Sequence, residues 1–410
     1  MKSKRFLFLT QYYPPEPGAA SLRLQAMAHQ LQRHGHEVEV VTAFLHHLGA
    51  KRRGGRPGQW MFTEEVNGVP VIRTWIWAVS TGRFWFRLLN YFSFVLTSFF
   101  GLLKSRRPDY VIVESPPLFL GMTAYLYGWL KRVPYILSVS DLWPESAIAL
   151  GLVKNRSLIR LTRALEHFLY RHAAYVSGVT EGICQTIRNT ETINPRRVLF
   201  FPNGVDMDLF RPQEAQKELV ENLGLSGKHV FLYPGTMGYA QGLEIIVDAA
   251  EMLKDYPDIV FLLVGEGPVK SSLQEDAKRR GLSNVVFEAL QPVERMSAYF
   301  AMARGVVVPL RRHKLFTGAR PSKVFPAWAA QVPVIFAGQG EMAMLIEEAG
   351  GGIVVPPEDG AGLAMAVEFL SRISDFEWQT MAKAGRDYVL SHYTWNRIAD
   401  QWLRGLLTDG

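Results

Sequence analysis

Short apolar runs alternate with longer segments along the first half of the chain, and this alternation predicts buried strands joined by helices. Residues 21–34 are expected to form a helix, and Val66-Asn67-Gly68-Val69 is the signal of a β-hairpin. Strands that alternate with helices favour a parallel sheet covered on both faces. The expected strands of this half are residues 6–10, 38–42, 71–73, 110–114, 135–139 and 174–177.

The pattern breaks near Asn203, and a polar, helix-prone stretch follows as far as Lys228 before the alternation restarts. We therefore expect an α/β protein with two Rossmann-like, doubly wound domains, residues 1–203 and 204–390, that face a cleft. The last helix, about residues 391–410, is expected to pack back on the first domain. The expected strands of the second half are residues 229–233, 260–264, 285–287, 305–310, 334–337 and 352–355.

Residues 318–334 carry the strongest signal for function. Ser322 is a good N-cap for a helix from Lys323 to about Ala330, and Arg320 lies just outside it. Free backbone N–H groups, the positive end of the helix dipole and two cations would converge there, which suits a phosphate or diphosphate. Taken alone, the segment is equally compatible with an ordinary helix start whose basic residues are solvated.

A glycine-rich loop follows the first strand of the second half. Residues 233–244 cross from that strand into a helix whose first turn we expect near Gln241. The free N–H groups of that turn would form a second cradle for an anion. Together with Arg320 and Lys323 in the same half, this loop favours a diphosphate ligand.

Two loops of the first half carry further candidates. The loop after the first strand is stiff until Gly18, which lets backbone approach a ligand closely, and Arg23 lies one turn into the next helix. Farther along, Asp141 and Glu145 flank a Trp-Pro step just after a strand. Asp141 has the chemistry to orient a hydroxyl or to stabilise developing positive charge, and the capping of a turn is the open alternative.

Composition narrows the class of partner. The chain has 410 residues, 48% hydrophobic and 20% charged, which indicates a globular protein of two or three domains. Its net charge of +7 suits nucleic acid, an anionic membrane or phosphorylated substrates, but no nucleic-acid-binding motif is present, so we expect no nucleic acid partner. The only cysteine, Cys184, excludes an internal disulfide and a cysteine-based metal cluster and fits a cytoplasmic protein.

The aromatic segment at residues 84–103 has two open interpretations. Its uninterrupted apolar part is shorter than a membrane span requires. It is therefore either a core helix or a helix whose apolar face lies on an anionic bilayer. The basic residues that flank it are Arg83, Lys104, Arg106 and Arg107.

Several different short motifs are spread along nearly the whole chain. They are Tyr-Tyr-Pro-Pro-Glu at 12–16, Arg-His-Gly-His-Glu-Val at 33–38, Asp-Leu-Trp-Pro-Glu at 141–145, Pro-Asn-Gly-Val-Asp at 202–206, Tyr-Pro-Gly-Thr at 233–236, Val-Gly-Glu-Gly-Pro at 264–268 and Pro-Ser-Lys at 321–323. In these motifs the chain resembles the GT-B retaining glycosyltransferases of family 4. More narrowly, it resembles bacterial enzymes that build O-antigen, colanic acid or other exopolysaccharide on a lipid carrier, the N-acetylfucosamine-transferase-like group.

The resemblance implies a nucleotide-sugar donor, most often a UDP-sugar, in the second domain and a polyprenyl-linked saccharide acceptor in the first. It implies no cofactor and no metal, because cations and helix ends take the metal's place. It also implies a cytoplasmic protein peripheral to the inner face of the cytoplasmic membrane. Asp141 is assigned to the reacting sugar, and Arg23 and Glu145 to the acceptor. The residues assigned to the donor are Gly18, Gly235, Thr236, Met237, Gln241, Glu288, Leu290, Arg320, Ser322 and Lys323.

The chain departs from the family pattern at two places. Thr236 and Gln241 stand where members commonly carry an arginine and a lysine, and the lysine of Pro-Ser-Lys compensates in the related group. Gly318 and Pro326 stand at the positions of the family's paired glutamates, the second of which normally binds the donor ribose. Because the side chain of Pro326 cannot do so, either the ribose is held otherwise, the alignment slips, or donor binding is altered.

Three functions therefore stay open at this point, with a retaining glycosyltransferase that passes a sugar to a polyprenyl-diphosphate-linked saccharide in the lead. A nucleotide-sugar epimerase on the same scaffold would need further acid/base carboxylates and histidines, which the loops do not offer. A non-catalytic module that binds a nucleotide-sugar or a partner enzyme is suggested by Gly318 and Pro326 and disfavoured by Arg320 and Lys323.

Overall fold

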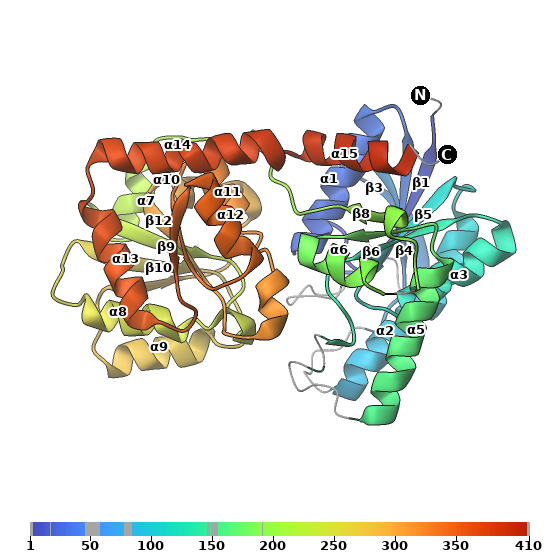
Figure 1. Ribbon diagram of the computed structural model, residues 1–410, viewed down its shortest axis with the longest axis horizontal. Helices are drawn as coiled ribbons and strands as arrows, with labels where there is room; N and C mark the ends of the chain where they lie inside the picture. Colours follow the sequence, from blue (N-terminus) through green and yellow to red (C-terminus); the bar gives the residue numbers. More distant parts are fainter. Residues whose placement is uncertain are drawn as a thin grey trace. The chain divides into compact units, whose positions relative to one another are not determined.

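The chain folds into two compact units (Figure 1). A computed structural model describes residues 3–16, 18–45, 58–77, 84–145, 148, 155–190 and 192–407. Unit 1 comprises Met1–Asn203 and Trp395–Gly410, and unit 2 comprises Gly204–Thr394. The last helix of the chain thus belongs to the first unit.

Unit 1 is built on an open, twisted sheet. Its strands are β1 Arg5–Leu9, β2 Glu37–Ala43, β3 Met61–Val66, β4 Val69–Thr74, β5 Tyr110–Ser115, β6 Tyr135–Val139, β7 Tyr175–Gly178 and β8 Val198–Phe200. Their order among the described residues is β3-β4-β2-β1-β5-β6-β7-β8, and neighbours run parallel except β3 and β4. The expected turn joins these two: Asn67 and Gly68 both have positive φ, 51° and 78°, as a type I′ hairpin requires.

Helices cover both faces of this sheet. They are α1 Ala19–Arg33, α2 Phe84–Lys104, α3 Leu120–Lys131, α5 Arg156–His172, α6 Glu181–Arg188 and α15 Trp395–Leu407. Successive strand residues point to opposite faces. On one face Phe6 lies 6.2 Å from Trp402 of α15, between ring centroids, and α1 packs beside α15 (Figure 1). On the other face Leu7 belongs to the core cluster that includes Phe94 of α2.

Unit 2 repeats this design with a fully parallel sheet. Its strands are β9 His229–Pro234, β10 Ile259–Val264, β11 Val285–Glu288, β12 Ala303–Pro309, β13 Val334–Ala337 and β14 Gly352–Val355, in the order β11-β10-β9-β12-β13-β14 among the described residues. Its helices are α7 Lys217–Asn222, α8 Glu244–Met252, α9 Lys270–Arg279, α10 Met296–Ala301, α11 Val324–Ala329, α12 Glu341–Ala349, α13 Gly360–Arg372 and α14 Asp375–His392. β10 is buried along its whole length, as expected for a strand covered on both faces.

The α/β architecture of parallel sheets is therefore as the sequence predicted. Strand ends differ by one or two residues, and β8, a short apolar run, was not among the expected strands. The last helix begins at Trp395 rather than near residue 391, because α14 continues to His392.

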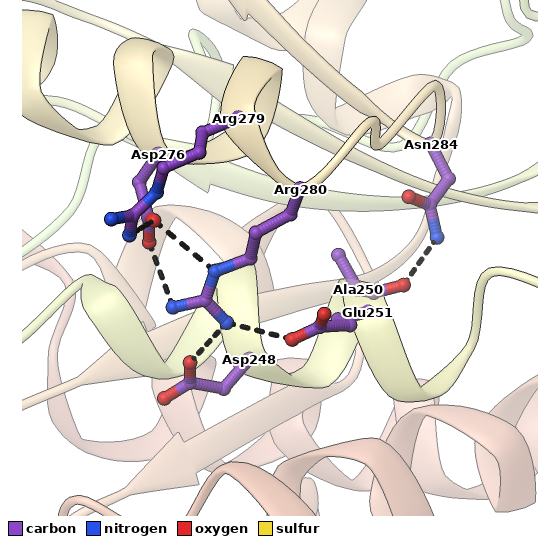
Figure 2. Close-up of polar contacts among 7 residues, drawn as sticks. All are labelled: Asp248, Ala250, Glu251, Asp276, Arg279, Arg280 and Asn284. Carbon is purple, nitrogen blue, oxygen red and sulfur yellow. Dashed lines mark hydrogen bonds and ion pairs between the residues drawn. The ribbon is translucent and has the colours of Figure 1, made fainter.

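A polar network ties α9 to α8 (Figure 2). Arg280, the residue after α9, contacts Asp276 of its own helix and donates to Asp248 and Glu251 of α8 at 2.8 and 2.9 Å. Hydrogen bonding to Asp276, then to Asp248 and Glu251, raises the pKa of Arg280 above its ordinary value. Arg279 donates to the same Asp276, so the network fixes one helix against the next inside unit 2.

Candidate functional site

Lys323 is the central residue of the candidate site in unit 2. Its ammonium donates to the Tyr233 hydroxyl at 3.1 Å and lies 4.6 Å from the centroid of the Tyr233 ring. Among the described residues no carboxylate forms an ion pair with this ammonium. Burial lowers the pKa of Lys323 to about 8. A desolvated cation that lacks a carboxylate partner favours the binding of an anion.

The glycine-rich loop meets Lys323 at the carboxyl end of β9. Gly235 has a φ of 106°, and a side chain at this position would lie 3.4 Å from Lys323 Nζ. The Tyr233 hydroxyl, which accepts a hydrogen bond from Lys323, donates to the Thr236 carbonyl at 2.5 Å. The structure thus brings together Gly235, Thr236 and Lys323, which sequence reasoning assigned to one diphosphate.

The loop that precedes α11 does not contain the predicted cap. α11 begins at Val324, Lys323 occupies its cap position in helical conformation, and no side chain caps the helix. Ser322 is therefore not an N-cap, because an N-cap residue is extended and its hydroxyl accepts from the N–H groups that follow. The predicted helix is therefore present within one residue at each end, and only the prediction of a Ser322 cap was wrong.

The second anion cradle also differs from the prediction. Residues Tyr239–Gln241 form a 3₁₀ turn that ends at Gly242 with φ 61°, so the α-helix begins at Glu244 and not near Gln241. Backbone N–H groups of this loop already donate to acceptors within unit 2. Those of residues 235, 237 and 238 are donated to Val264 O, Glu266 O and Gln241 Oε1 at 2.7, 2.9 and 3.1 Å. Lys323 is consequently the stronger anion-binding group.

Arg320 differs from Lys323 in having a carboxylate partner. Its Nε forms an ion pair with Glu341, and its Nη1 donates to the Tyr393 hydroxyl at 2.6 Å. The guanidinium carbon lies 5.7 Å from the centroid of the Tyr393 ring. Contact between Arg320 and a diphosphate stays a prediction, because a carboxylate already neutralises this cation.

The other donor candidates of unit 2 lie in different environments. The side chain of Met237 lies in the core, which leaves only its backbone to a ligand. The side-chain oxygen of Gln241 accepts from the backbone and braces its own loop. Leu290 is exposed two residues beyond Glu288, whose carbonyl accepts from Lys270 Nζ at 2.9 Å. Their contacts with the donor stay predictions.

In unit 1, Arg23 is attached to the loop that carries Asp141. Arg23 is only 2% exposed, and its Nη2 donates to Glu114 Oε1 and to Ser140 Oγ, each at 2.5 Å. Its Nη1 donates to Asn203 Oδ1 at 3.3 Å, and the Ser140 hydroxyl itself donates to Glu114. Arg23 therefore fixes the start of this loop from inside, and its direct contact with an acceptor stays a prediction.

The remaining candidates of unit 1 follow strands at the carboxyl edge of the sheet. Asp141 is partly exposed in a bend two residues beyond β6. Glu145 pairs with Arg163 of α5 at 2.9 Å. Gly18 is the N-cap residue of α1 with φ 141°, and nothing lies within 4 Å of the position of a side chain there. Open space and the absence of a side chain keep this backbone accessible, and its contact with a ligand stays a prediction.

Comparison with known families identifies the chain. The Glycosyl transferase 4-like domain matches residues 18–204, and the Glycosyl transferases group 1 domain matches residues 228–372. The chain belongs to the family 4 glycosyltransferases. The glycosyltransferase is 29% identical over 298 residues to a glycosyl transferase named for colanic acid biosynthesis, WcaI of Escherichia coli K12, covering 71% of this chain and 72% of the relative. It is 27% identical over 228 residues to O-antigen chain mannosyltransferase C of Escherichia coli, covering 53% of this chain and 57% of the relative.

Solved structures show the same fold. The glycosyltransferase superposes on sucrose-phosphate synthase of Thermosynechococcus elongatus with a TM-score of 0.74 and 18% identity, covering 99% of this chain and 100% of that one. It superposes on HepE of Anabaena in complex with UDP-glucose with a TM-score of 0.71 and 17% identity, covering 99% and 100%. These likenesses and the two parallel sheets confirm the predicted GT-B fold.

Both departures from the family's glutamates fit the fold of this glycosyltransferase. Pro326 is the third residue of α11, so its missing N–H removes no helical hydrogen bond. Gly318 ends a 3₁₀ turn, Lys314–Gly318. Neither side chain offers an acceptor to a ribose hydroxyl, as the sequence indicated.

Sequence reasoning missed the residues that hold the candidates in place. Tyr233 was part of an expected strand, and Glu341 and Tyr393 are far from Arg320 in the chain, so no local pattern links them. Glu114 did carry a signal. It is a carboxylate at the end of an otherwise apolar strand, β5, and a buried carboxylate requires a cationic or hydrogen-bonding partner.

Proposed function

We propose that this glycosyltransferase transfers a sugar from a UDP-sugar to a polyprenyl-diphosphate-linked saccharide, with retention of configuration, during synthesis of a bacterial surface polysaccharide. The observation that carries the donor assignment is the Lys323 ammonium, desolvated beside Gly235 and, in the described part of the chain, without a carboxylate partner. The names of the relatives, for colanic acid and O-antigen, support the pathway. HepE, solved with UDP-glucose, supports the class of donor.

The chemistry explains the need for a cation. The bond between the anomeric carbon and the diphosphate oxygen breaks, the acceptor hydroxyl oxygen forms the new bond to the anomeric carbon, and the hydroxyl proton passes to the departing diphosphate oxygen. Negative charge develops on the departing UDP, and the desolvated ammonium of Lys323 stabilises it. Lys323 supplies the positive charge, and the proposal invokes no metal cofactor. Asp141 is proposed to act at the reacting sugar, where positive charge develops.

The proposal assigns donor binding to unit 2 and acceptor binding to unit 1, with Glu145 and Arg23 as acceptor residues. It places the enzyme at the inner face of the cytoplasmic membrane, where polyprenyl-linked saccharides are extended. Among the described residues, no helix combines the length and the apolar character that crossing a bilayer demands.

Thermal-shift titration with UDP, GDP, ADP and dTDP tests the donor site. UDP is expected to raise the melting temperature of the wild-type protein, because a ligand that binds only the native state stabilises it. The shift should vanish in Lys323→Ala and persist in Lys278→Ala, which removes an exposed lysine of α9. Stabilisation of Lys323→Ala equal to that of the wild type would overturn the site. UDP binding without consumption of any UDP-sugar in the presence of lipid-linked acceptors would favour the non-catalytic module.

The affinity for UDP is expected to fall as pH rises through about 8. Burial lowers the pKa of Lys323 to about 8, so the side chain is cationic below this value and neutral above it. Calorimetric titration should show binding about tenfold weaker at about pH 9 than at about pH 7. Each pH unit above the pKa lowers the cationic fraction of Lys323 about tenfold. Lys323→Arg should lose this dependence because a guanidinium stays charged. A wild-type dissociation constant that does not change over this range would contradict the assignment.

A further inference from the structure

α2 presents apolar side chains in two directions. One side faces the core: Phe94 and Leu102 are buried, and a side chain at Gly101 would lie 2.7 Å from Val41. The other side faces solvent although it is equally apolar, and Leu96 on it is 68% exposed. Over residues 89–104 of α2, whose side chains the structure describes, the exposed large ones are Leu89, Phe92, Leu96, Phe100 and Leu103. Their spacing of three or four residues places them in one stripe along the helix.

α3 widens this stripe into a surface. Phe92 packs on Phe119 with ring centroids 4.9 Å apart, and Thr123 Oγ1 donates to Val95 O at 3.1 Å, so the two helices run side by side in the same direction. Trp129 of α3 is 75% exposed. We define the α2–α3 face as the exposed residues Leu89, Phe92, Leu96, Phe100 and Leu103 of α2 and Leu126, Trp129 and Leu130 of α3. Contiguous apolar surface of this kind marks an interaction site.

The charged residues within α2 and α3 have one sign. Neither α2 nor α3 contains an acidic residue. Both helices end in exposed cations, which, because the helices run in the same direction, lie at the same end of the face. These cations are Lys104, which ends α2, with Arg106 and Arg107 beyond it, and Lys131, which ends α3, with Arg132 beyond it. Arg106 also lies 3.9 Å from Glu37, and the other four have no ion pair within the described residues.

We propose that the α2–α3 face docks on an anionic lipid bilayer. Its leucine, phenylalanine and tryptophan side chains enter the boundary between headgroups and acyl chains, and the cations at its end bind the anionic headgroups. The inference deepens the proposed function and rests on it, because a polyprenyl-linked acceptor lies in a bilayer that the enzyme must reach.

The core side of α2 connects the same helix to a candidate substrate loop. Gln11 Nε2 donates to Asn90 Oδ1 at 2.7 Å, and Asn90 Nδ2 donates to the Trp77 carbonyl at 2.8 Å. Gln11 begins the loop that contains Gly18. The helix that would rest on the bilayer thus also fixes the start of the loop that we assign to a ligand. Docking of α2 would therefore set the position of this loop relative to the membrane.

Co-sedimentation with vesicles tests the docking surface. The vesicles contain phosphatidylcholine with about 30% phosphatidylglycerol, and neither donor nor acceptor is added. Wild-type protein is expected to sediment with them, and the double variant Leu96→Glu/Trp129→Glu should bind at least about tenfold more weakly, because both side chains lose their apolar burial. The matched control is Met365→Glu/Phe376→Glu, which adds the same charge at two exposed apolar positions of unit 2 and should bind like the wild type.

A second variant tests the cations. Lys104→Glu/Arg107→Glu should weaken binding to the anionic vesicles, and wild-type protein should bind vesicles of pure phosphatidylcholine more weakly than anionic ones. Equal binding by Leu96→Glu/Trp129→Glu and the control Met365→Glu/Phe376→Glu would overturn the proposal. So would wild-type protein that ignores vesicles but dimerises through this face, as light scattering would show if Leu96→Glu/Trp129→Glu were monomeric. UDP-induced stabilisation of each variant is read in parallel. It verifies the fold and separates failure of docking from failure of the donor site.

Discussion

Lys323→Ala is expected to lower the turnover of a UDP-sugar about 100- to 1000-fold, the usual cost of removing one group that stabilises charge in a transition state. The fold should survive the change. The wild-type ammonium is desolvated without a carboxylate partner in the described chain, and burial lowers its pKa to about 8. Removing an uncompensated cation relieves a desolvation cost, whereas removing one member of a pair would create it.

The measurement is release of UDP with a lipid-linked acceptor under saturating donor. Lys278→Ala serves as the control, since it removes a lysine of the same unit from the exposed side of α9. Turnover of Lys323→Ala within a few-fold of the wild type would refute the role of this lysine. Arg320 makes a poorer test, because its replacement also disturbs Glu341 and Tyr393, and a loss of activity would then have two explanations.

The fold could be predicted because its signals are local. The strand β10 is a continuous apolar run, and the Asn67-Gly68 pair alone specifies the only antiparallel pairing within the described sheets. The meeting of Gly235 and Lys323 also follows from topology. They lie on loops after β9 and β12, which are parallel neighbours, and the carboxyl ends of such strands share one edge of the sheet.

The details of the site could not be predicted in this way. Whether Ser322 caps a helix depends on the backbone conformation of Lys323, which the amino-acid types do not determine. The pairing of Arg320 with Glu341 and the lowered pKa of Lys323 both arise from tertiary packing and the burial it produces. Sequence reasoning therefore brought Lys323 and Gly235 together, as the structure does, but it gave the lysine a capped helix and an arginine as partners. The structure shows no side-chain cap on α11, and Arg320 pairs with Glu341.

The aromatic segment shows a different kind of ambiguity. The sequence left a core helix and a surface helix as alternatives, and α2 has both properties at once. Phe94 and Leu102 pack inward while Leu96 and Phe100 face solvent. A helix that is apolar on all sides has no amphipathic signal, so its periodicity cannot show which side is covered.

Glu114→Ala is expected to reduce the free energy of unfolding of unit 1 by about 3–5 kcal/mol, the cost of leaving one charge of a buried pair without its partner. Arg23 and Glu114 have side-chain exposures of 2% and 4% and are 2.5 Å apart. Without Glu114, the guanidinium of Arg23 keeps only neutral partners, Ser140 and Asn203, in a position that water does not reach. The start of the Asp141 loop should loosen with it.

Urea unfolding followed by circular dichroism measures this loss. Glu37→Ala is the matched control: it breaks the ion pair with Arg5, in which Glu37 is 56% exposed, and should cost less than about 1 kcal/mol. The double variant Arg23→Met/Glu114→Leu should recover most of the stability, because apolar residues of similar volume replace both buried charges. If Glu114→Ala cost no more than Glu37→Ala, the buried pair would not be what holds α1 to the end of β5. Recovery of stability without recovery of turnover in the double variant would show that the pair serves to position Ser140 and Asp141.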